Sequence, residues 1–191
     1  MAQLSRPPRV IVDDDADVAL VERCRHGDWT AFTELVVRYQ RPIYNAAYWV
    51  LHKPEDANDI TQVVFLKVAE RLDEYDPRFK FFSWIYRIAV NESLNLLRRN
   101  GRDESLDDDA DFAAPESADP ERQASDAEVA ARIRAALMKM TSKDRLVLTL
   151  RHFSECSYDE IGEILELDSK TVKSRLFEAR RRLRELLGDL H

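Results

Sequence analysis

The chain has 191 residues, of which 45% are hydrophobic and 34% charged, and its formal net charge is -7 at pH 7. This length suits one medium domain or two small ones, and the apolar content can bury a core, which excludes wholesale disorder. Only four glycines and seven prolines occur, so the composition favours a helix-dominated fold with few tight turns. We therefore expect an all-α protein.

The sequence offers little for catalysis or metal binding. Cys24 and Cys156 form no CxxC pair, so neither a disulfide framework nor a zinc site is indicated. The four histidines lack HxxxH and HExxH spacing, and no P-loop or GxGxxG motif occurs. We expect no enzymatic activity, no metal and no cofactor. The N-terminus lacks an apolar signal segment and no apolar run approaches the roughly 18 residues of a membrane span, which predicts a soluble cytoplasmic protein.

Charge is distributed unevenly along the chain. Residues 101–128 carry two basic and 11 acidic side chains, a net charge of -9, with two prolines and almost no large apolar residues. Such a composition cannot bury enough surface to offset the entropy of ordering, so it predicts a flexible acidic linker. The linker separates a helical domain at 18–100 from a smaller one at 129–191. Residues 1–17 are expected to form a flexible tail.

Residues 18–100 follow the pattern of three or four amphipathic helices, with apolar side chains at the spacing of helices that bury one face. Pro42 falls inside the second helix and is expected to kink or break it, whereas Pro54 and the acidic residues after it suit a helix N-terminus. Residues 73–80 interrupt the pattern as a loop. The expected helices are Val18–His26, Thr30–Leu51, Glu55–Leu72 and Phe81–Arg99.

The C-terminal domain is expected to contain four helices. Ser157 and Glu160 have the spacing of a capping box, and Asp168 is placed to cap the last helix. A short capped helix, a brief turn and a second, basic helix together form the helix-turn-helix pattern. The expected helices are Glu128–Lys139, Ser142–Phe153, Tyr158–Leu165 and a last one from Ser169 to about Leu187.

The last helix concentrates positive charge, since seven basic residues lie between Lys170 and Arg184 with only Glu178 opposing them. Serine, lysine and arginine can contact base edges in the major groove and neutralise phosphates, so the pattern favours binding of duplex DNA. A solvated basic face is the alternative interpretation. A stripe of Val172, Leu176, Ala179 and Leu183 is expected to be buried. The candidate DNA-binding residues are Ser169, Lys170, Lys173, Ser174, Arg175, Phe177 and Arg180.

The segment 75–99 mixes aromatic side chains with arginine, lysine and asparagine. This mixture suits single-stranded nucleic acid, whose bases stack on aromatic or guanidinium planes. The alternative, of equal weight from spacing alone, is that Phe81, Phe82, Trp84 and Tyr86 are core residues.

In the predicted helix 55–72, the polar residues Asp56, Asp59 and Gln62 recur every three positions opposite the apolar stripe. Spacing alone favours a solvated acidic face. The alternative is a docking surface for a basic partner.

Three segments together resemble a known family. The helix pair SYDEIGEILELDSKTVKSRLFEARRRLRELL is similar to the promoter-reading domain of bacterial extracytoplasmic-function sigma factors, which belong to the sigma-70 family. DANDITQVVFLKVAERL and FFSWIYRIAVNESLNLLRR are similar to the N-terminal domain of the same family. The resemblance covers both domains and implies an alternative sigma factor that binds core RNA polymerase, recognises the -35 and -10 promoter elements and promotes melting. A helix-turn-helix regulator acting alone is the alternative, although it leaves residues 18–100 without a role.

The resemblance also implies roles for individual residues. Helix 55–72 would dock on core polymerase through Asp56, Asp59, Gln62 and Phe65. The loop 73–80 and helix 81–99 would read the melted -10 strand and hold one flipped base; the residues expected there are Tyr75, Arg78, Phe79, Lys80, Trp84, Arg87, Asn91 and Asn95. Helix 169–187 would read the -35 element as duplex DNA, and helix 143–153 would contact the polymerase flap. An anti-sigma factor, often membrane-bound, is a further expected partner.

Two positions depart from the family pattern. Asn95 occupies a position where Asp is common, and Glu166 occupies a turn position where Gly is common, so that turn must adopt a conformation open to a side chain. The acidic linker 101–128 would pass through the basic active-site cleft of the polymerase as a nucleic-acid mimic. A solubilising spacer is the alternative.

Overall fold

The computed structural model describes residues 14–100 and 120–188, and within these ranges every regular element is a helix, which confirms the prediction of an all-α fold. The elements are α1 (Asp14–Arg25), α2 (Trp29–Leu51), α3 (Pro54–Arg71), the 3-10 helix η1 (Leu72–Glu74), α4 (Phe81–Arg99), α5 (Pro120–Met138), α6 (Ser142–His152), α7 (Tyr158–Leu165) and α8 (Ser169–Gly188).

Two helices, α1 and α5, begin several residues earlier than expected, whereas α2 and α3 begin one residue earlier. Residues 14–17, expected in the tail, form the first turn of α1, and residues 120–128, expected in the linker, belong to α5. The stretch PERQASDAE is acidic, but Ala, Glu, Gln and Arg are strong helix formers, and this propensity accounts for the earlier start. The remainder of the expected tail (1–13) and linker (101–119) lies outside the described residues.

The N-terminal helices are organised around α2, which packs against α1, α3 and α4. Asp28 caps α2, since its side chain accepts hydrogen bonds from the backbone N–H groups of Thr30 and Ala31. The sequence predicts either a kink or a break at Pro42. The helix continues through this residue, so it is not broken there. Its inner stripe is fully buried and includes Leu35, Tyr39, Ile43 and Ala47.

A buried carboxylate joins α1 to α2. Asp17 is fully buried and accepts hydrogen bonds from the hydroxyl of Tyr39 and the guanidinium of Arg38. Burial raises the pKa of Asp17, and these two partners oppose the shift. The ion pair fixes α1 on α2, and α1 in turn supports the loop that follows η1 through Arg25.

The helix-turn-helix is formed by α7 and α8. Both bonds of the predicted capping box are present: the N–H of Glu160 donates to the Ser157 hydroxyl at 3.1 Å, and the N–H of Ser157 donates to the Glu160 carboxylate at 2.7 Å. Glu166 ends α7 in the left-handed region at φ 54°, so the turn keeps the backbone conformation that favours glycine, and the glutamate adopts it at a cost in conformational energy. Asp168 caps α8 as predicted by accepting from the N–H of Thr171 at 2.9 Å.

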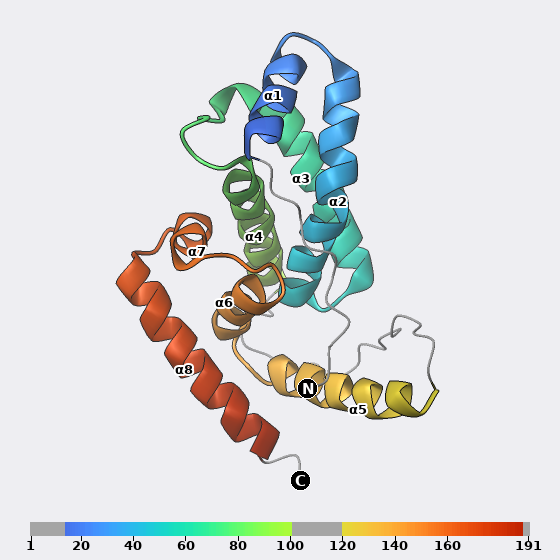
Figure 1. Ribbon diagram of the computed structural model, residues 1–191, viewed down its shortest axis with the longest axis vertical. Coiled ribbons are helices and arrows are strands. Elements are labelled where there is room, and N and C mark those ends of the chain that lie inside the picture. The colour runs from blue at the N-terminus through green and yellow to red at the C-terminus, as the bar shows by residue number, and fades with distance from the viewer. Residues whose placement is uncertain (1–13, 101–119, 189–191) are drawn as a thin grey trace.

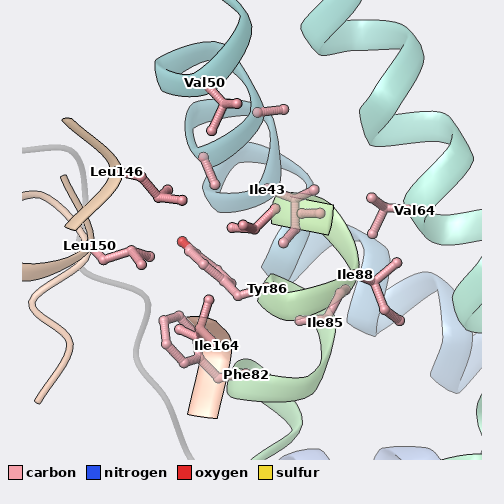
Figure 2. Close-up of a cluster of buried hydrophobic side chains, with 14 of the residues drawn as sticks. Ile43, Val50, Val64, Phe82, Ile85, Tyr86, Ile88, Leu146, Leu150 and Ile164 are labelled. Atoms are coloured by element: carbon pink, nitrogen blue, oxygen red, sulfur yellow. The ribbon is translucent and has the colours of Figure 1, made fainter. Parts of the chain in front are cut away.

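The two halves of the chain share one continuous hydrophobic core. In Figure 1, α4 lies between the first three helices and the group formed by α6 and α7. Figure 2 shows Tyr86 of α4 directed toward Leu146 and Leu150 of α6, whereas Ile88 lies on the other side of α4, toward Val64 of α3. Because α4 is apolar on two sides, it packs against both groups of helices, and this contact was not predicted.

Candidate nucleic-acid interfaces

The buried stripe predicted for α8 is confirmed for its first three members. Val172, Leu176 and Ala179 are 0–1% exposed, and Leu183 is half-buried. The stripe packs on α6 and α7, so the opposite face of α8 is held outward as one rigid surface. This face contains the exposed residues Lys170, Lys173, Ser174 and Phe177, with Ser169, Arg175 and Arg180 half-buried at its margins.

The cations of α8 fall into two groups. Arg181 pairs with Glu178 at 2.7 Å and with Glu185 at 2.9 Å, and Arg182 pairs with Asp144. Within the part of the chain that the structure describes, no carboxylate pairs with the four cations nearer the N-terminus, which are Lys170, Lys173, Arg175 and Arg180. A reading helix contacts bases with its N-terminal turns, so the open cations lie where such contacts are made.

Arg180 is positioned by a neutral histidine. Its Nε lies 3.4 Å from Nε2 of His152. Burial, together with the charges of Arg180 and Arg151, lowers the pKa of His152, so its ring is neutral at pH 7 and Nε2 can accept. His152 was not among the predicted site residues, because a single histidine on the preceding helix carries no pattern.

A second candidate surface surrounds the loop between η1 and α4. The Tyr75 ring is buried and packs edge-on against Phe81, with centroids 5.4 Å apart, while its hydroxyl donates to the carbonyl of Phe79 at 2.7 Å. This bond closes the loop and leaves the Phe79 side chain 54% exposed. The guanidinium of Arg25 in α1 donates to the carbonyls of Leu72 at 3.0 Å and Tyr75 at 2.6 Å. The loop is therefore fixed from both sides.

A cavity of about 550 Å³ opens beside this loop. Four of the predicted -10 residues line it: Tyr75, Phe79, Trp84 and Arg87. Ser83 also lines the cavity and was not predicted; it is 3% exposed, and its hydroxyl has no hydrogen-bond partner among the described residues. The opposite wall comes from the helix-turn-helix: Asp159, Gly162, Glu163, Glu166, Leu167 and Ser169.

The other predicted -10 residues lie outside the cavity. Arg78 is held by Asp76 at 2.5 Å and is exposed, and Lys80 is directed to carboxylates from other helices. Asn91 is exposed, and Asn95 is half-buried and accepts from Arg98 at 3.3 Å. With Trp84 and Arg87, the two asparagines follow the three- and four-residue spacing of one helix face, so they extend the cavity surface along α4.

The burial of the aromatic side chains of α4 supports the core interpretation for some of them and the strand-contact interpretation for another. Phe81, Phe82 and Tyr86 are 1–2% exposed and belong to the core, whereas Trp84 is only half-buried and lines the cavity.

The outer face of α3 combines polar and apolar side chains. Asp59 and Gln62 are exposed, Asp56 and Phe65 are half-buried, and Leu66 is 63% exposed. A single exposed leucine is common on protein surfaces, so the docking surface on α3 stays a prediction. Figure 1 shows α3 and α8 on opposite sides of α4, so both surfaces can be engaged at once.

Neither a metal centre nor a membrane span occurs in the described ranges. Residues 14–100 and 120–188 contain no group of three or more His, Cys, Asp or Glu side chains that could hold a metal ion. Nor does any helix in these ranges have the length and apolarity needed to cross a membrane.

Comparisons with known proteins match both halves of the chain. The family model of sigma-70 region 2 matches residues 35–103, and that of sigma-70 region 4 matches residues 130–183. RNA polymerase sigma-H factor of Pseudomonas aeruginosa is 31% identical over 189 residues, covering 94% of this chain and 98% of the relative. ECF RNA polymerase sigma factor SigW of Bacillus subtilis is 34% identical over 181 residues, covering 89% and 96%. The solved structure of CnrH in complex with the cytosolic domain of CnrY is similar with a TM-score of 0.69 at 27% identity, covering 92% of this chain and 99% of that one.

Proposed function

We propose that three surfaces of this chain, which belongs to the extracytoplasmic-function group of the sigma-70 family, divide the work of transcription initiation. The chain is an alternative sigma factor, which binds core RNA polymerase and directs it to promoters. In our proposal α8 reads the -35 element, α4 with its preceding loop reads the melted -10 element, and α3 docks on the polymerase. The supporting observations are that cations of α8 without a carboxylate partner among the described residues lie on its outward face, and that aromatic side chains of α4 and its preceding loop line a cavity.

At the -35 element, the first turns of α8 enter the major groove. Lys170, Lys173 and Arg175 supply phosphate and base-edge contacts, and the exposed ring of Phe177 offers an apolar contact of the kind made with thymine methyl groups. Arg181 and Arg182 are held by carboxylates and contribute less.

At the -10 element, the cavity beside α4 receives an unstacked base of the non-template strand. Phe79 and Trp84 provide stacking surfaces, and Arg87 provides a cation for the strand. The buried hydroxyl of Ser83 can hydrogen-bond to a base edge, which would satisfy a group that has no partner among the described residues. The structural role of Tyr75 is to close the loop that carries Phe79.

The remaining assignments follow from family membership and charge. α3 contacts core polymerase through the surface of Asp56, Asp59, Gln62 and Phe65, to which we add Leu66. The acidic segment 101–128 follows the basic active-site cleft of the polymerase, on the basis of its net charge. The chain acts in the cytoplasm without catalysis of its own. An anti-sigma factor is a partner, and the similar protein CnrH supports this assignment because it forms a complex with the cytosolic domain of another protein, CnrY.

In vitro transcription tests the whole proposal. The purified chain is added to core RNA polymerase of the host bacterium on a library of its genomic fragments, and the 5′ ends of the transcripts are sequenced. We expect starts that share a -35 and a -10 sequence and that are missing with core polymerase alone. Transcript starts that do not change on addition of the chain would contradict the proposal, and tight sequence-specific duplex binding by the free chain without such starts would favour a regulator that acts alone.

A further inference from the structure

The cavity beside the loop between η1 and α4 has the size and lining of a small-molecule site. Its volume of about 550 Å³ lies within the range of cavities that bind small ligands, roughly 300–1,000 Å³. Tyr75, Phe79 and Trp84 supply aromatic surface, and polar side chains reach the cavity from both halves of the chain. The charges of these polar groups indicate which class of ligand the cavity suits.

Carboxylates outnumber cations around the cavity. Among the described residues that line it, the one cation is Arg87, and a guanidinium nitrogen of this residue lies 3.9 Å from Oε1 of Glu166. The carboxylates that line the cavity belong to Glu74, Asp76, Asp159, Glu163 and Glu166. Carboxylates of one sign around a partly apolar cavity attract a cation and disfavour an anion.

Two of these carboxylates have no ion-pair partner within the described ranges. Glu74 is paired with Arg71 and Asp76 with Arg78, each at 2.5 Å. Asp159 and Glu163 are both exposed, and they lie four residues apart on α7, so they share one face of the helix. Like charges at this spacing destabilise a helix, and a cation bound between them would remove that repulsion.

The arrangement of the carboxylates favours an extended cation over a metal ion. No three His, Cys, Asp or Glu side chains of residues 14–100 and 120–188 come together where they could hold a metal ion. A compact divalent ion needs several oxygen ligands around one point. A chain that carries ammonium groups some distance apart can instead reach acidic and polar groups at separate places in the cavity.

A buried hydroxyl provides a second polar contact. Ser83 lines the cavity from α4 and is 3% exposed, and its hydroxyl has no hydrogen-bond partner among the described residues. A buried hydroxyl without a partner costs free energy, and an ammonium N–H can donate to its oxygen. The ring faces of Phe79 and Trp84 also attract ammonium groups, and they offer apolar surface to methylene groups.

We propose that this cavity is a binding site for a polyamine, a chain of methylene groups that carries two or more ammonium groups. One ammonium group lies between Asp159 and Glu163, the chain crosses Phe79 and Trp84, and an inner ammonium group donates to the hydroxyl of Ser83. Because the ligand contacts α4 and α7 together, binding stabilises the folded protein.

The site shares residues with the surface proposed to read the -10 strand. Phe79, Trp84 and Ser83 are the proposed contacts of an unstacked base, so a polyamine and the base exclude each other where that role holds. Binding of the polyamine to the free protein does not depend on that role, and its test uses neither DNA nor polymerase.

Isothermal titration calorimetry with spermidine tests the site on nucleic-acid-free protein at about 0.15 M NaCl. We expect saturable binding to one site. Asp159→Asn with Glu163→Gln should weaken it by about tenfold. Both residues are exposed and the Ser157–Glu160 capping box is retained, so the double variant should fold, as circular dichroism can verify.

The matched control is Asp107→Asn with Asp108→Asn, which makes the same change of charge in the acidic segment 101–128. It should bind spermidine as tightly as wild type, and Mg²⁺ at the same concentration should not displace the ligand. Binding that does not saturate, an equal loss in the control variant, or displacement by Mg²⁺ would each show only a general attraction to negative charge and would overturn the site.

Nuclear magnetic resonance tests the location in the unmodified protein. The chain has three tryptophans, and of these only Trp84 lines the cavity. Its indole N–H resonance, assigned by its loss in Trp84→Phe, should shift as spermidine is added, whereas those of Trp29 and Trp49 should not. A Trp84 resonance that stays in place at saturation, or three resonances that shift alike, would refute the proposed site.

Discussion

The guanidinium of Arg145 donates a hydrogen bond of 2.9 Å to the backbone carbonyl of Trp49, 96 residues earlier in the chain. The same side chain donates to the carbonyls of Leu137 at 3.1 Å and Met140 at 3.3 Å. It thus joins the C-terminal ends of α2 and α5 to α6. Burial lowers the pKa of Arg145 to about 10, which still leaves it charged at pH 7.

Replacing Arg145 with methionine should destabilise the protein. The substitution leaves several buried carbonyls without a donor, so we expect the free energy of unfolding to fall by roughly 1–3 kcal/mol. Urea unfolding followed by circular dichroism measures it, with Lys143→Met, an exposed cation on the same helix, as the near-neutral control. Equal stability of the Arg145→Met variant and wild type would mean that desolvation of the guanidinium cancels its hydrogen bonds.

The cations of α8 should differ in their effect on -35 binding. Lys173→Ala and Arg175→Ala should each weaken holoenzyme binding to a duplex carrying the -35 element and reduce the slope of log K against log salt by about one. Arg181→Ala should change both much less, because that guanidinium is paired with Glu178 and Glu185. Fluorescence anisotropy over a salt series measures both quantities. Similar losses of duplex affinity for Arg181→Ala and Lys173→Ala would show that intramolecular ion pairs do not decide which cations of α8 contact the DNA.

Local signals in the sequence predict the helices better than they predict how the two halves of the chain pack together. The bounds of α4 and α7 agree with their predictions because apolar periodicity and the Ser157–Glu160 capping box are local. The bonds from Arg145 to Trp49 and from Arg25 to the loop join residues 47 to 96 positions apart, and no local pattern encodes them. Spacing in the sequence does not show that Tyr86 is buried between two groups of helices. An aromatic residue that packs against only one group has the same spacing on an amphipathic helix.

Gly162 should be essential to the helix-turn-helix turn. A Cβ added at Gly162 would lie 2.7 Å from the carbonyl oxygen of Leu167, whereas one at Gly188 would meet nothing within 4 Å. Gly162→Ala should therefore displace the turn and lower the free energy of unfolding by about 1–3 kcal/mol, with weaker -35 binding. Gly188→Ala should be neutral or slightly stabilising. Thermal unfolding and duplex binding test the pair, and an unchanged Gly162→Ala variant would contradict the close approach.

His52 links stability to pH. It ends α2 in the left-handed region at φ 60°, and neither ring nitrogen has a hydrogen-bond partner among the described residues. Burial, with a smaller effect from the charge of Arg145, lowers the pKa of His52 to about 3. The ring is therefore neutral in the folded protein, whereas in the unfolded chain it takes up a proton near pH 6.5.

Because the folded-state pKa is the lower one, the contribution of His52 to stability is present above pH 6.5 and is lost as the pH falls toward 3. Between pH 7 and pH 5 the loss should be about 2 kcal/mol in the free energy of unfolding. His52→Asn removes the titrating ring, and asparagine tolerates the left-handed conformation. Urea unfolding of both proteins at the two pH values isolates this residue, since Asp17 and His152 titrate alike in each. Parallel losses in wild type and His52→Asn would show that His52 is already protonated or solvated in the folded state.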